Sequence, residues 1–207
     1  MKKIVIIDYG MGNICSVASA IEYLGLASCL SSDREIILEA DFIILPGVGS
    51  FNLAMQKIRQ LKLYDTLRCA GLDRKIPMLG ICLGMQLLAM SGTEDGFTEG
   101  LGLIDGNVER FNADTSLVKV PHVGFSTTNI VSTDSPLFRG LPQEVDFYYT
   151  HSYRMICSTD CLLATGCNGE TFAAAVGKNN IYGTQFHPEM SQANGLHLLK
   201  NFFSECG

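Results

Sequence analysis

Hydrophobic and polar positions in the first half of the chain follow two alternating patterns. Short runs of β-branched and aliphatic residues predict buried strands at 3–8, 27–30, 41–45 and 76–81. Apolar residues at helical spacing predict helices at 13–24, 51–61 and 83–90. Gly25 is placed to end the first helix and Ser50 to cap the second. Repeated strand–helix units of this kind indicate a mostly parallel central sheet with helices on both faces.

After about residue 102 the pattern changes to short alternating segments separated by turn residues. Strands are predicted at 106–111, 117–121, 145–149, 162–167, 171–176 and 181–186. We expect additional antiparallel strands in this C-terminal half, extending the same sheet or forming a small second one. A closing helix should begin after Ser191, with Leu196, Leu199 and Phe203 on one face. Residues 1–207 contain no linker or repeat, so a single α/β domain is expected.

The composition narrows the classes of function. Hydrophobic residues make up 47% and charged residues 17%, which excludes a disordered chain. The net charge of −6 comes without a basic run, so a nucleic-acid partner is not expected. The apolar run at 4–7 is too short for a signal peptide and no stretch is long enough to span a bilayer. We therefore expect a cytoplasmic protein with no membrane partner.

Eight cysteines raise the question of disulfides or a metal site. None of them forms a C-x-x-C pair, and a secretory signal is not seen. The cluster Cys157, Cys161 and Cys167 has no paired histidine and lies in strand-like sequence. Reduced thiols are therefore expected, and no metal.

The segment around Cys82 has the pattern of a nucleophile elbow. A predicted strand runs into a predicted helix at this cysteine, with Gly80 two residues before it and Gly84 two residues after. A helix N-terminus favours a thiolate, and the Leu83 N–H could donate to an oxyanion. The alternative is a buried structural cysteine at a glycine-rich strand end.

The segment Gly183 to Glu189 ends in His187-Pro188-Glu189. In an extended chain, residues two apart point to the same side, and Pro188 should keep the link extended. A histidine oriented by a carboxylate and facing a cysteine is the arrangement of nucleophile, base and orienting group. On its own, the segment would be interpreted as a surface His-Pro turn, but in combination with the cysteine elbow the catalytic interpretation is favoured.

Two glycine-containing loops follow predicted strands. In Gly47-Val48-Gly49, backbone N–H groups could turn outward and bind a developing negative charge, although a plain strand–helix turn is the alternative. The second loop, Gly10-Met11-Gly12, lacks the third glycine of a dinucleotide site, because Cys15 stands in its place. No cofactor is therefore expected.

Together, the elbow, the Pro46-Gly47-Val48-Gly49 loop and the His-Pro-Glu segment resemble the class I, or triad, glutamine amidotransferases. Within that family the resemblance is closest to the amidotransferase subunits of imidazole glycerol phosphate synthases. It extends over nearly the whole chain, in order, through 8–13, 46–51 with 54–55, 80–88, 100–104 with 110–111, 119–124, and 148–153 followed by 183–191.

The resemblance implies hydrolysis of glutamine to glutamate and ammonia through a cysteinyl thioester. It implies that Cys82 is the nucleophile, His187 the general base and acid, and Glu189 the group that orients the histidine. The residues that it implies in binding glutamine and the oxyanion are Val48, Gly49, Leu83, Gln86, Ser152 and Tyr153.

The partner implied is a (β/α)₈-barrel cyclase or synthase subunit, forming a heterodimer that makes imidazole glycerol phosphate and aminoimidazole carboxamide ribotide in histidine biosynthesis. The residues implied at that interface are Asn13, Pro121, His122 and Tyr148. The chain departs from the family pattern at Phe125, where tryptophan is usual, and at Met190, where lysine is usual. A paralogous subunit for a sugar-amidine synthase in surface-polysaccharide assembly is one alternative. A stand-alone γ-glutamyl cysteine hydrolase and a non-catalytic binding module are the others.

Overall fold

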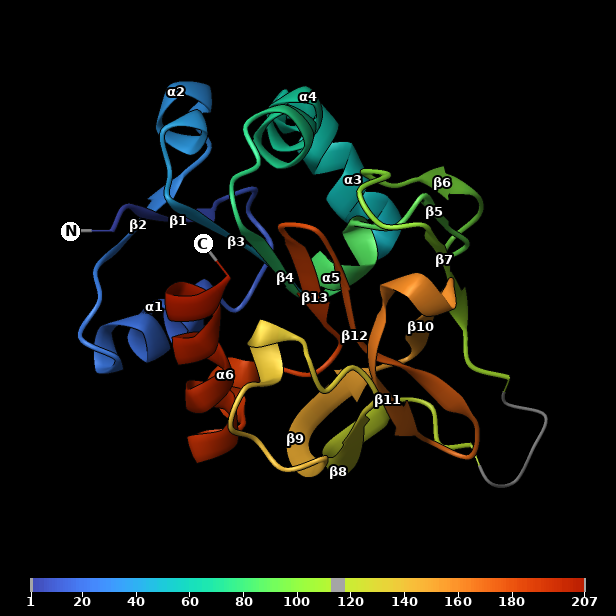
Figure 1. Cartoon of the computed structure of the whole chain (residues 1–207). Coiled ribbons are helices and arrows are strands. Elements are labelled where there is room, and N and C mark those ends of the chain that lie inside the picture. The colour runs from blue at the N-terminus through green and yellow to red at the C-terminus, as the bar shows by residue number, and fades with distance from the viewer. Residues whose placement is uncertain (1, 113–117, 207) are drawn as a thin grey trace.

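The computed structural model describes residues 2–112 and 118–206 and is built around a nine-stranded sheet (Figure 1). Its parallel half contains, in spatial order, β2 (Ser28–Ser31), β1 (Ile4–Ile7), β3 (Phe42–Gly47), β4 (Met78–Cys82) and β13 (Ile181–Thr184). Its antiparallel half continues with β12 (Thr171–Lys178), β11 (Leu162–Cys167), β8 (His122–Ile130) and β9 (Glu144–His151). A second, four-stranded sheet contains β10 (Tyr153–Cys157), β7 (Gly106–Arg110), β5 (Ser91–Gly92) and β6 (Thr98–Glu99).

Helices cover both faces of the parallel half, as Figure 1 shows. One face carries α1 (Ile14–Tyr23) and α6 (Gln192–Glu205), and the other carries α2 (Arg34–Leu38), α3 (Phe51–Gln60), α4 (Leu63–Arg68) and α5 (Leu83–Leu87). The two cores follow the alternation of β1: Ile4 and Ile6 belong to the cluster with α1 and α6, whereas Val5 and Ile7 belong to the other cluster. β1 and β3 are buried at every position, which agrees with their apolar sequences, whereas the edge strand β2 is partly exposed and contains two serines.

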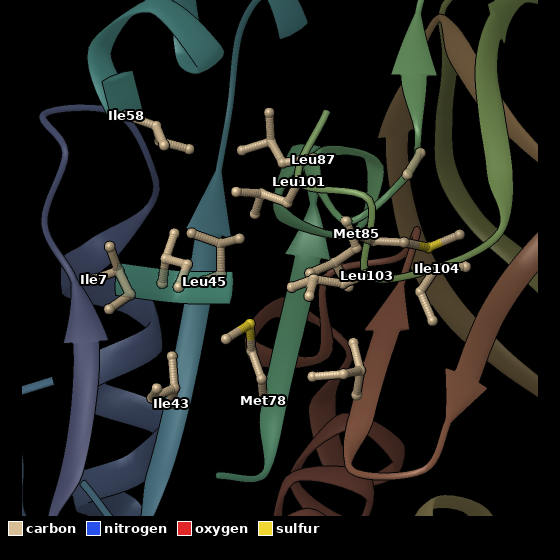
Figure 2. Close-up of a cluster of buried hydrophobic side chains, with 14 of the residues drawn as sticks. Ile7, Ile43, Leu45, Ile58, Met78, Met85, Leu87, Leu101, Leu103 and Ile104 are labelled. Carbon is tan, nitrogen blue, oxygen red and sulfur yellow. The ribbon is translucent and has the colours of Figure 1, made fainter. Parts of the chain in front are cut away.

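Figure 2 shows the core beneath α3 and α5. Aliphatic side chains from β1, β3 and β4 meet side chains from α3, α5 and the loop before β7, namely Ile7, Ile43, Leu45, Met78, Ile58, Met85, Leu87, Leu101, Leu103 and Ile104. Burying one such side chain contributes about 1.5–3 kcal/mol. This packing fixes α5 against the strand that precedes it. In the described part of the chain, no helix has the length and apolar character needed to cross a membrane.

The expected fold class is confirmed, with both a longer sheet and a second small one. The predicted helix at 83–90 is too long, since α5 ends at Leu87 and the chain turns toward β5. The predicted strand at 117–121 is wrong: residue 117 lies outside the described residues, and 118–121 are not a strand.

The sequence pattern misses β8, β10, α2 and α4. In β8 the usual pattern is inverted, because Val123 and Phe125 are exposed while His122 and Thr128 are buried. The helix α2 is only five residues long, which is too short for apolar residues to show a helical spacing. The Asp33 carboxylate caps it by accepting hydrogen bonds from two backbone N–H groups. Short elements of this kind depend on tertiary packing and leave little periodicity.

Because α5 packs closely on β3, we expect a substitution of Gly84 to destabilise the fold. A β-carbon at Gly84 would lie 1.8 Å from the carbonyl oxygen of Leu45, so Gly84→Ala should lower the free energy of unfolding by about 3 kcal/mol or more. Gly25 is the matched control: a β-carbon there meets open space, and its φ of +74° alone should cost about 1–2 kcal/mol. Urea unfolding of both variants measures the difference. Equal losses would contradict the packing described for α5.

Candidate active site

The strand–turn–helix corner predicted around Cys82 is present in the structure. Cys82 ends β4 with φ 54° and ψ −110°, a conformation that non-glycine residues rarely adopt. A β-carbon at Gly80 would lie 2.6 Å from the carbonyl oxygen of Gly84, so strand and helix can approach only because both residues are glycine. The strained turn places the sulfur at the carboxyl edge of the parallel strands, at the start of α5.

A cavity of about 560 Å³ opens beside Cys82. It is lined by all six residues that the sequence nominates for binding glutamine and the oxyanion, Val48, Gly49, Leu83, Gln86, Ser152 and Tyr153. These residues come from the loop after β3, from α5 and from the junction of β9 and β10. The structure therefore brings the predicted set together at one place.

His187 and Glu189 form a buried pair. The Nδ1 atom of His187 lies 2.8 Å from the Oε1 atom of Glu189, and the two side chains are 3% and 1% exposed. The expected extended link is wrong, because Pro188–Met190 forms a 3₁₀ turn that folds the carboxylate back onto the ring. The Ser191 hydroxyl fixes this turn by donating to the His187 carbonyl oxygen at 2.6 Å. Ser191 is the N-cap position of α6, as expected, but its hydroxyl serves the turn.

The surroundings of His187 favour its charged form. Burial lowers its pKa, but the neighbouring Cys82 sulfur and the Glu189 carboxylate outweigh burial and raise that pKa to about 10. Among the described residues, the Nε2 atom of His187 has no hydrogen-bond partner of good geometry. The Cys82 sulfur nevertheless acts on the ring electrostatically, since it is among the groups that raise the pKa of His187. An imidazolium beside the sulfur stabilises a thiolate.

Two further groups touch the sulfur, and the sequence analysis missed both. The Sγ atom of Cys82 lies 3.7 Å from the Thr150 carbonyl oxygen and 3.7 Å from the Nε2 atom of Gln185. Gln185 could have been found, because it lies two residues before His187 in a strand-like segment and so points to the same side. Thr150 offers no signal, since a backbone carbonyl carries no residue type.

Glu94 also lines the cavity and was missed. Its carboxylate accepts a hydrogen bond from the Phe51 backbone N–H at 2.7 Å, which fixes it at the start of α3. Burial raises the pKa of Glu94. In the sequence it stands in the turn Glu94-Asp95-Gly96, and acidic residues in turns are usually solvated, so no pattern distinguishes it.

Two buried histidines, His122 and His151, contact each other beside the cavity, and His151 is one of its lining residues. The Nδ1 atom of His122 lies 3.0 Å from the Nε2 atom of His151, and both side chains are buried. Burial lowers the pKa of His122 and lowers that of His151 to about 3. His122 is only 6% exposed, and its place at a partner interface stays a prediction.

Of the other residues expected at an interface, Pro121 precedes β8, Tyr148 lies in β9 and Asn13 precedes α1. Pro121 is exposed, and Asn13 and Tyr148 are half-buried. Exposed Phe125 packs its ring 5.6 Å from that of Tyr148. Asn13 reaches the triad region, with its Nδ2 atom 3.5 Å from Glu189 Oε1. We call the surface formed by Asn13, Pro121, Phe125, Tyr148 and Met190 the β8–β9 face.

Comparison with known proteins identifies relatives over the full length. The family model described as "Glutamine amidotransferase class-I" matches residues 5–206. The imidazole glycerol phosphate synthase subunit HisH of Methanosarcina barkeri (strain Fusaro) is 45% identical, with 100% of both chains covered. Subunit HisH 1 of Campylobacter jejuni (strain 81-176) is 43% identical over 96% of this chain and 98% of that protein.

Solved structures with lower sequence identity share the fold. PurLQS from Thermotoga maritima superposes with a TM-score of 0.74 at 17% identity, covering 98% of both chains. The glutaminase domain of Trypanosoma brucei CTPS, solved with acivicin, gives a TM-score of 0.67 at 18% identity, covering 98% of this chain and 94% of that one.

The shifted pKa of His151 predicts a loss of stability in acid. The ring stays neutral when folded, with a pKa of about 3, but takes up a proton near pH 6.5 when unfolded, so stability falls as the pH drops below about 6.5. His151→Gln should remove about 2 kcal/mol of the loss seen between about pH 6.5 and 4.5. Urea unfolding at several pH values measures this slope. His197→Gln, on the exposed side of α6, is the control, and equal slopes for both variants would refute the assignment.

Proposed function

Because this chain belongs to the class I glutamine amidotransferases, we propose that it is the glutaminase subunit of an imidazole glycerol phosphate synthase in histidine biosynthesis. The observation that carries the proposal is the full-length identity of 43–45% to subunits with that name, combined with an intact cysteine, histidine and glutamate at one cavity.

In the proposed reaction, the Cys82 thiolate attacks the side-chain amide carbon of glutamine. The carbonyl electrons move to the oxygen, which the Leu83 N–H and the Val48–Gly49 backbone would stabilise. The protonated His187 then gives its proton to the departing nitrogen, the C–N bond breaks, and ammonia leaves a γ-glutamyl thioester.

The second half of the reaction returns the enzyme to its starting state. Water attacks the thioester while neutral His187 accepts its proton, the C–S bond breaks, and glutamate and the thiolate result. Glu189 keeps the ring in place and stabilises its positive charge between the two steps.

To bind the amino-acid end of glutamine, the protein needs a carboxylate for the α-ammonium group and hydrogen-bond partners for the α-carboxylate. Glu94 supplies a fixed negative charge at the cavity, suited to the α-ammonium group of the substrate. The Ser152–Tyr153 segment lies at the same cavity and would hold the α-carboxylate. With the Glu94 carboxylate at the α-ammonium group and the Ser152–Tyr153 segment at the α-carboxylate, the cavity would select an α-amino acid over a simple amide.

The released ammonia is proposed to pass to a (β/α)₈-barrel partner docked on the β8–β9 face. Ammonia in neutral water is mostly protonated and is then not a nucleophile, so a closed route preserves its reactivity. Apolar Phe125 and Met190 are 50% and 42% exposed on this face. These two residues also favour a second candidate, a paralogous subunit serving a sugar-amidine synthase, because they replace the tryptophan and lysine usual in the histidine-pathway family.

The test is reconstitution with the barrel subunit. We expect slow glutamine hydrolysis by the chain alone and an increase of about 100-fold or more with the barrel and its ribotide substrate. Cys82→Ala should lower glutamine-dependent synthesis by about 1,000-fold or more while ammonia-dependent synthesis continues. Cys29→Ala, an exposed cysteine on β2, is the matched control and should keep both activities.

Two results would count against the proposal. Fast hydrolysis by the isolated chain, without stimulation, would indicate a stand-alone hydrolase. Loss of both synthesis activities in Cys82→Ala would indicate that the cysteine is structural.

A further inference from the structure

The backbone carbonyl of Tyr153 determines which atoms donate and which accept in a series of buried hydrogen bonds. Its oxygen lies 2.9 Å from His151 Nδ1 and 3.0 Å from Gln86 Nε2. A carbonyl oxygen can only accept, so both nitrogens must donate to it. This fixes the tautomer of His151 and the direction of the Gln86 amide.

The orientation of Gln86 fixes that of the next amide. The remaining N–H of Gln86 donates to the Oε1 atom of Gln185 at 2.9 Å. The Nε2 atom of Gln185 is thereby turned away from Gln86, toward the Cys82 sulfur at 3.7 Å. Gln185 is fully buried and Gln86 is 5% exposed, so solvent does not compete for these bonds.

At the other end of this series of hydrogen bonds, the contacts of His122 are consistent with His151 Nδ1 as the donor to the Tyr153 carbonyl. Its Nε2 atom lies 3.0 Å from Nδ1 of His122, whose Nε2 atom in turn lies 2.8 Å from the Ser126 hydroxyl. With His151 Nδ1 donating to Tyr153, its Nε2 accepts from His122 and the His122 Nε2 accepts from Ser126. Burial lowers the pKa of both rings, so both stay neutral and the donors and acceptors keep these directions.

Gln185 and Thr150 act in opposite directions on the sulfur. A thiol can donate its proton to the Thr150 carbonyl, whereas a thiolate cannot and is repelled by it. An amide N–H can donate to either form but bonds more strongly to the charged one. The amide of Gln185 therefore favours the thiolate and holds it in one position.

We propose that Gln185 is a positioning residue for the nucleophile, its side-chain amide donating to the Cys82 sulfur and aimed there by Gln86. The role rests on the proposed function in that Cys82 is the attacking group. Gln185 is then a neutral hydrogen-bond donor that acts beside the charged pair of His187 and Glu189. Together these groups determine where the sulfur lies and how readily it ionises.

The test follows alkylation of Cys82 by iodoacetamide between about pH 5 and 10, because only the thiolate reacts. Mass spectrometry of the peptide that contains Cys82 separates it from the exposed Cys15, Cys29 and Cys167. Gln185→Met removes the donor at similar volume and should move the pH midpoint of alkylation upward by about one unit. Gln185→Glu keeps the acceptor for Gln86 but places a carboxylate at the sulfur, and should move the midpoint further.

The matched control is Gln143→Glu, which makes the same charge change at an exposed position before β9. It should leave the midpoint where it is in the unaltered chain. Unchanged midpoints in both Gln185 variants, with folding confirmed by circular dichroism, would overturn the proposal.

A second measurement works on the unaltered chain if the variants do not fold. In ¹⁵N spectra, one glutamine side-chain amide should shift when Cys82 is alkylated, and Gln86, which bonds to Gln185, should follow more weakly. No shift in any buried glutamine amide would also overturn the proposal. Alkylation needs neither glutamine nor a partner, so absence of glutaminase activity with a shifted midpoint would count only against the proposed function.

Discussion

The site depends on one backbone constraint, the positive φ of Cys82 at the corner between β4 and α5. An L-residue accepts that conformation only when its surroundings hold it, and here the glycines on either side allow strand and helix to pack without β-carbons between them. Because β3, β4 and β13 are parallel neighbours, their carboxyl ends lie at one edge of the sheet. The Gly47–Gly49 loop, the sulfur and the His187 turn therefore converge there without long connections.

Electrostatic surroundings then give similar side chains different charges. His187 faces a carboxylate and a sulfur, and its pKa is raised to about 10 despite burial. His151 contacts a neutral ring and a carbonyl, and burial lowers its pKa to about 3. At neutral pH one imidazole is charged and the other is not. Two positive rings close together would repel each other, so the neutrality of His151 supports the charge on His187.

The sequence predicts the parts of the molecule whose chemistry is local. The buried strands of the parallel half, the Gly80–Gly84 corner and the His-Pro-Glu segment are each readable within a few residues. The remaining site residues are supplied by tertiary structure. Glu94 reaches the cavity from a turn between two short strands, and Thr150 contributes a backbone oxygen. The strand that carries His122 was missed because its apolar side chains face outward, which also explains why His122 is buried and not at the surface.

The central claim is that His187 is an imidazolium beside Cys82 at neutral pH. The chain contains only four histidines, so ¹⁵N spectra of histidine-labelled protein can be assigned with single His→Gln variants. At about pH 7.5 both ring nitrogens of His187 should carry protons, and deprotonation should occur only toward about pH 10. A neutral His187 ring at that pH would contradict the account.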